Sequence, residues 1–123
     1  MLGDSKAFSG FAVDDLAKAK AFYEDVLGLR TSEEHGLMTL HLAGDRPTLV
    51  YPKPDHEPAT YTVLNFPVED IDAAVDGLAE RGVTFELYEG SGQDEKRIMR
   101  QYGPPIAWFR DPAGNILSVL QQD

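Results

Sequence analysis

The chain has 123 residues with 21 Asp and Glu against 11 Lys and Arg, which gives a formal charge of -10 at neutral pH. This acidic balance argues against a nucleic-acid partner and against docking to anionic membranes, because both need a positive surface. With 42% hydrophobic residues and no cysteine, we expect a single globular domain without disulfides or sulfur-ligated zinc. Apolar runs of membrane-spanning or signal-peptide length are missing from the sequence, which predicts a soluble cytoplasmic protein.

The first predicted element is a short strand at residues 8–13, in which Phe11 and Val13 share one face. Asp15 follows at a position where its carboxylate can cap a helix. Apolar residues then recur at helical spacing until Gly28, whose left-handed conformation would end the helix. The sequence therefore predicts a strand, an acidic cap and an amphipathic helix in that order.

The same pattern returns 55 residues later. Residues 61–68 predict a strand, Asp70 a cap, and the apolar positions from 71 to 78 a helix that Gly82 ends. The two terminal glycines are 54 residues apart, one fewer than the other matched positions. We interpret the repeat as a duplication; the pairs at the common offset are Phe11/Phe66, Val13/Val68, Asp15/Asp70 and Leu16/Ile71.

Strand-like segments follow each helix. They lie at 29–33, 37–43 and 48–51 in the first half, and at 83–88, 106–110 and 116–121 in the second. The last two are joined by Asp111–Gly114, whose proline and glycine suit a tight hairpin turn. The sequence thus predicts an α+β fold of two βαβββ modules, at about 6–57 and 60–121, within one domain.

Residues 89–105 form the one long segment without a regular pattern, polar and rich in glycine. Such a segment in a small domain is typical of a lid or a binding loop.

Three stretches give the chain a family resemblance, namely Val13-Asp14-Asp15-Leu16, Val68-Glu69-Asp70-Ile71 and Phe109-Arg110-Asp111-Pro112-Ala113-Gly114-Asn115. The duplicated module that carries them resembles the vicinal oxygen chelate superfamily, which includes glyoxalase I, extradiol dioxygenases, fosfomycin-modifying enzymes and bleomycin-resistance proteins. The resemblance implies a curved, half-barrel mixed sheet with the helices on its outer face and a small-molecule ligand in the concave cup. It also implies a homodimer.

Metal-dependent members of that superfamily hold one divalent ion with four side chains, and the resemblance places these positions at Phe8, near Val50, at Val63 and at Ser118. Phenylalanine and valine have no lone pair, and a serine hydroxyl is a poor ligand for Zn²⁺ or Fe²⁺. We therefore expect neither a metal nor another cofactor, and no metal-dependent glyoxalase, dioxygenase or epimerase activity.

Strand alternation then predicts what lines the cup. If Phe8 faces inward, so do Val63, Asn65 and Ser118, with Trp108 opposite Ser118 on the paired strand and His41 on another. Tyr61 would share the inward face of its strand. Tyr102 lies where the family's loop touches ligand. The candidate ligand-binding residues are Phe8, His41, Val63, Asn65, Tyr102, Trp108 and Ser118.

Each candidate also has a purely structural interpretation: Trp108 as ordinary core, His41 as a strand histidine, and Arg110 as half of an ion pair. Three functions stay open. The first is a metal-free protein that binds a hydrophobic or cationic compound. The second is a glyoxalase-like lyase or dioxygenase-type enzyme that uses metal-independent residues or a displaced metal site, for instance one involving His41. The third is a structural module whose own side chains fill the cup. No catalytic residue can be assigned.

Overall fold

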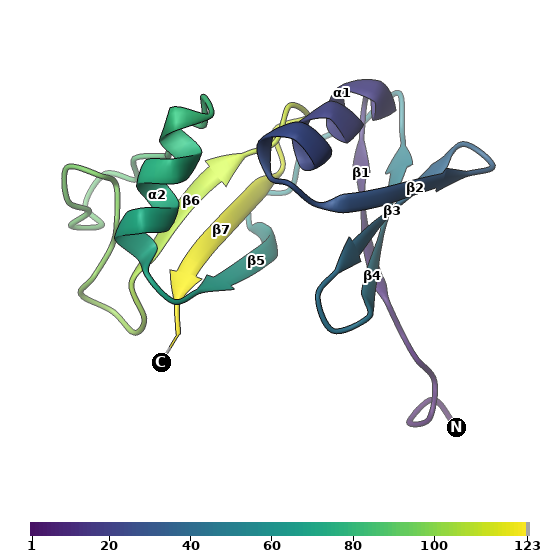
Figure 1. Cartoon of the computed structure of the whole chain (residues 1–123), viewed down its shortest axis with the longest axis horizontal. Coiled ribbons are helices and arrows are strands. Elements are labelled where there is room, and N and C mark those ends of the chain that lie inside the picture. Colours follow the sequence, from purple (N-terminus) through teal and green to yellow (C-terminus); the bar gives the residue numbers. More distant parts are fainter. Residues whose placement is uncertain (123) are drawn as a thin grey trace. The chain divides into compact units, whose positions relative to one another are not determined.

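A computed structural model describes residues 1–122, and the chain forms two compact units, Met1–His56 and a second that begins at Glu57 (Figure 1). Each unit combines a mixed sheet with a helix, so the predicted α+β class is confirmed. Among residues 1–122, no helix has both the length and the apolar character needed to cross a bilayer.

The first unit is a complete βαβββ module. Its sheet has the order β1-β4-β3-β2, with β1 and β4 parallel and the other pairs antiparallel. The strands are β1 (Ser9–Val13), β2 (Arg30–Glu34), β3 (Leu37–Leu42) and β4 (Arg46–Pro52), and helix α1 (Leu16–Ala21) follows β1. Phe11 and Val13 are both buried, as their predicted common face requires, and the Phe11 ring centroid lies 6.0 Å from that of Tyr23. Met38 and Leu40 on β3 are fully buried.

The sequence predicts one helix that runs from the Asp15 cap to Gly28, but only the first part of this helix is α-helical. It continues from α1 as a π-helix, η1 (Phe22–Val26), in which the Leu27 N–H donates to the Phe22 carbonyl at 3.1 Å. A bond across five residues widens the turn and accommodates one more residue than an α-helix of the same rise.

The second unit repeats the topology with one strand fewer. Its sheet has the order β5-β7-β6 and is built from β5 (Thr62–Val68), β6 (Ile106–Arg110) and β7 (Ile116–Gln121), with helix α2 (Ile71–Glu80) between β5 and β6. The strand predicted at 83–88 is wrong: Phe85 makes a single bridge to Phe109, and no ladder follows. The ladder ends early because the Tyr88 N–H donates to the Gln93 side chain at 2.7 Å instead of to a strand.

The two acidic caps have nearly the same geometry. Asp15 has φ -131° and ψ 106°, and Asp70 has φ -135° and ψ 102°. Each carboxylate accepts from the backbone N–H three residues later at 3.1 Å. The predicted duplication therefore extends to backbone dihedrals.

Residues 89–105 are irregular, as predicted, but they are held in place by specific contacts. The Gln93 amide donates to the carbonyls of Glu86 and Arg97, both at 2.7 Å, and Ile98 is fully buried. Lys96 and Arg100 then pair with Asp72 on α2 at 3.5 and 2.8 Å. We call residues 93–100 the strap.

Candidate functional site

The second unit contains a hollow of about 430 Å³ beside the start of β5. One wall is aromatic and another is a run of small and proline residues that leads into β5. The hollow is lined by Pro58, Ala59, Thr60, Tyr61, Thr62, Tyr88, Trp108, Arg110 and Ile116.

Trp108 is fixed in this wall by two contacts. Its indole N–H donates to the Thr62 hydroxyl at 3.1 Å, and its ring meets that of Tyr88 edge-on, with centroids 5.3 Å apart and planes at 76°. Edge-to-face pairing is a favourable geometry for aromatic rings and limits their rotation. The hollow therefore has a preformed aromatic corner.

A β-bulge at Val63 explains why Thr62 reaches Trp108. Thr62 pairs with Ile116 on β7 while Leu64 pairs with Leu117, so Val63 is an extra residue without a partner in the ladder. The extra residue reverses the alternation on its N-terminal side. The prediction that Val63 alternates with Asn65 is therefore wrong, and Thr62 takes that side of the sheet. Tyr61 and Thr62 both line the hollow.

Asn65, Ser118 and Trp108 lie in one row across the second sheet, as the strand register predicts. Ser118 is fully buried, and its hydroxyl donates to the Asn65 side-chain oxygen at 2.5 Å. With its proton already bonded and its oxygen away from solvent, Ser118 is a structural group in this row and cannot serve as an exposed nucleophile.

Arg110 and Glu86 form an ion pair at the edge of the hollow, and Arg110 also donates to the Gly114 carbonyl at 3.0 Å. The hydrogen bond to Glu86 raises the pKa of the Arg110 guanidinium. Burial, followed by the charge of Glu86, raises the pKa of Tyr88, so its phenol is a neutral hydrogen-bond donor at physiological pH. The site thus offers aromatic faces and a phenol, with its charges paired.

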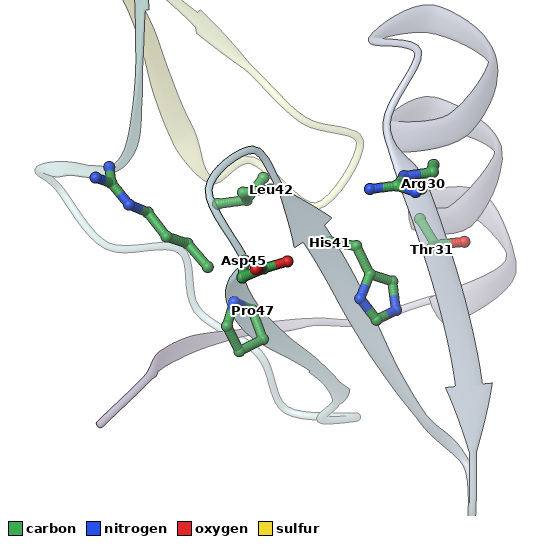
Figure 2. A pocket seen from close by; sticks show the side chains of 7 residues that line it. Arg30, Thr31, His41, Leu42, Asp45 and Pro47 are labelled. Carbon is green, nitrogen blue, oxygen red and sulfur yellow. The ribbon is translucent and has the colours of Figure 1, made fainter. Parts of the chain in front are cut away.

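The first unit has a separate hollow of about 600 Å³, lined by Arg30, Thr31, His41, Leu42, Asp45, Arg46 and Pro47 (Figure 2). His41 lies on β3 beside β2, and its Nε2 is 2.7 Å from the Ser32 hydroxyl.

The remaining candidates lie apart from both hollows. Phe8 precedes β1 and is 62% exposed, and Tyr102 follows the strap and is 69% exposed. Sequence reasoning missed Thr62 and Tyr88. The position of Thr62 in the hollow depends on the bulge, which no sequence pattern marks. Tyr88 could have been proposed as a site residue from the sequence, because it is an aromatic residue directly before the irregular segment 89–105.

The family's metal positions do not fit a metal in this chain. Val50 is fully buried, and the Ser118 hydroxyl is bonded to Asn65. Among residues 1–122, no group of three or more His, Cys, Asp or Glu side chains is arranged to hold an ion.

The chain is similar to several known proteins in sequence or in fold. The uncharacterized protein YraH of Bacillus subtilis (strain 168) is 26% identical over 124 residues, covering 89% of this chain and 91% of YraH. TnmS3, an antibiotic binding protein from Streptomyces sp. CB03234, has a TM-score of 0.67 at 22% identity, over 98% of each chain. The fosfomycin resistance protein FosX from Listeria monocytogenes has a TM-score of 0.72 at 14% identity, over 98% of this chain and 94% of FosX.

A family model covers almost the whole chain, from residue 8 to residue 119, and includes both units. The chain therefore belongs to the Glyoxalase/Bleomycin resistance protein/Dioxygenase superfamily.

Proposed function

We propose that this protein binds a small hydrophobic or cationic aromatic compound, without a metal, in the hollow of its second unit. The observation that carries this proposal is the aromatic corner of Trp108 and Tyr88, held by the bond to Thr62. An immobilised aromatic wall loses little conformational entropy when a planar ligand stacks on it. Pockets for small molecules typically combine such apolar walls with a few fixed polar groups.

The charge of the second unit favours a cationic ligand. Residues 57–123 contain twelve Asp and Glu against five Lys and Arg, a net charge of -7 out of the -10 of the whole chain. A negative field attracts cations over several ångströms, and the faces of Trp108 and Tyr88 add a cation–π contribution. The likeness to TnmS3, described as an antibiotic binding protein, supports a drug-like ligand.

The chain offers its own probe, because Trp108 is its single tryptophan. We expect cationic aromatic antibiotics to change the fluorescence of Trp108 in a saturable titration. Tyr88→Ala should weaken binding about tenfold, since it removes one aromatic wall, whereas Tyr88→Phe should bind nearly as well as the natural protein.

Tyr51→Ala is the matched control, because it removes an exposed tyrosine from the first unit. Titrations that stay flat for cationic and neutral aromatic compounds alike would exclude this ligand class. Equal affinities for Tyr88→Ala and Tyr51→Ala would show that binding takes place elsewhere.

We also propose that the protein forms a homodimer. Large apolar side chains are exposed on both units, including Phe8 and Leu37 on the first and Tyr61 on the second. Exposed apolar side chains are the usual starting point for association with a second copy.

A further inference from the structure

The hollow of the first unit differs from that of the second in its charge. Two arginines, Arg30 and Arg46, line it together with a single carboxylate, Asp45. Within residues 1–122, neither of these two guanidiniums forms an ion pair, whereas Arg100 and Arg110 both do. The chain has almost twice as many acidic as basic residues. This hollow is therefore unusual, because it has two arginines and one carboxylate and so a net positive charge.

Arg30 belongs to a row of hydrogen-bond donors. It pairs directly with His41 across β2 and β3, and Ser32, two residues further along β2, shares its face. The Ser32 hydroxyl and the His41 Nε2 are 2.7 Å apart. A guanidinium, a hydroxyl and an imidazole therefore lie on one exposed sheet face. Figure 2 shows Arg30 and His41 on adjacent strands, and Asp45 lies in the turn before Pro47, which pairs with His41 from β4.

The three groups complement an oxyanion. Arginine presents planar paired donors that match the two oxygens of a carboxylate or phosphate. When the His41 Nε2–H donates to the Ser32 oxygen, the serine proton is free to donate to a ligand. Leu42 and Pro47 supply an apolar wall in the hollow that Arg30 and His41 line, and Ser32 adjoins this hollow through its contact with His41.

We propose that Arg30, Ser32 and His41 bind the carboxylate or phosphate group of a small ligand whose apolar part lies against Leu42 and Pro47. This inference is independent of the proposed function, because its residues lie in the other unit and its signal does not involve Trp108.

Histidine-ring NMR on the whole protein tests the proposal, with benzoate and phenyl phosphate as probes. The His41 ring signal is assigned with His41→Gln and the His35 signal with His35→Gln, and the exposed His35 is the internal reference for general ionic effects. We expect a saturable shift of the His41 signal with at least one probe while His35 stays unchanged. Arg30→Gln should reduce the affinity at least tenfold.

Lys6→Gln is the matched control, since it removes one exposed, unpaired positive charge from the same unit outside the hollow. It should change the affinity less than twofold.

Thermal melts check that Arg30→Gln still folds. Arg30→Lys is a second variant that keeps the positive charge, and a lower affinity than that of the natural protein would show that the planar guanidinium matters as well as the charge. A stronger response to benzoate identifies a carboxylate ligand, and a stronger response to phenyl phosphate identifies a phosphate ligand. The proposal is overturned if neither probe shifts His41 or if Arg30→Gln binds as well as Lys6→Gln.

Discussion

Asp15 and Asp70 act as helix caps, and each satisfies a backbone N–H that has no partner within its helix. Their side chains are exposed, and their effect depends on hydrogen-bond geometry more than on burial. The acidic residue before each cap, Asp14 or Glu69, has the same charge but makes no such bond. These four residues separate the effect of a cap from that of a negative charge.

We expect Asp15→Ala and Asp70→Ala each to lower the free energy of unfolding by about 1 kcal/mol, as loss of a cap does elsewhere. Asp14→Ala and Glu69→Ala should change it by less than about 0.5 kcal/mol, because they remove a charge and no cap. Urea unfolding monitored by circular dichroism measures all four. Equal losses within each pair would show that charge near the helix, and not capping, is responsible.

The sequence predicts the structural role of a single residue well when its hydrogen-bond partners are close to it in the chain. The caps, and Asp111, which accepts from the N–H groups of Ala113 and Asn115, lie within four residues of their partners. The Trp108–Thr62 bond joins residues 46 apart and depends on a bulge that no local pattern marks. The candidate site was therefore predicted in part: its tryptophan was identified, but neither of the side chains that hold it.

The strap is the element whose character differs most from expectation. Asp94 organises it by accepting from the backbone N–H groups of Lys96 and Ile98, both at 2.9 Å, and from the Arg100 side chain at 3.0 Å. The strap lies within residues 89–105, which the sequence predicted as a lid or a binding loop, but side-chain bonds to its backbone replace the ladder that a strand would have provided. This replacement could not be read from the sequence, because any of several polar residues in the segment could have had this role.

Stability should depend on pH through Asp94. Burial by itself raises the pKa of this carboxyl, but the hydrogen bonds from Ile98, Arg100 and Lys96 outweigh burial and hold the pKa below its usual value of 3.8. Since the pKa is lower in the folded state, the carboxylate contributes stability above about pH 4 and loses it as the pH falls through the folded value. Asp94→Asn should therefore be less stable than the natural protein at pH 7, with the difference shrinking towards pH 3.

Thermal melts at pH 7, 5 and 3 measure this convergence. Glu95→Gln, an exposed acidic neighbour outside the network, should run parallel to the natural protein at all three values. A difference for Asp94→Asn that stays constant with pH would mean that its charge is not involved.

The negative charge of the whole molecule is unevenly distributed between its two units. The first unit carries nine acidic residues against six basic ones, a net charge of -3, and the remaining -7 lies in the second. Two copies of the chain repel each other at long range, so their association depends on apolar contact and on screening of the charges.

We therefore expect the proposed homodimer to tighten as salt rises from about 20 mM, where the Debye length is more than twice that at physiological ionic strength. Light scattering coupled to gel filtration at micromolar concentration measures the mass at each salt level. A monomer at physiological salt would exclude the dimer, and a dimer that dissociates as salt rises would show that ion pairs hold it.

The π-helix accounts for the irregular spacing between the two halves of the sequence. Leu16 and Gly28 are 12 residues apart, and their counterparts Ile71 and Gly82 are 11 apart, while the wide turn at Phe22–Val26 accommodates one surplus residue. The wide turn is therefore the place where the first half holds one residue more than the second. An alignment of the two halves stays in register without a gap up to this turn and needs one single-residue gap there.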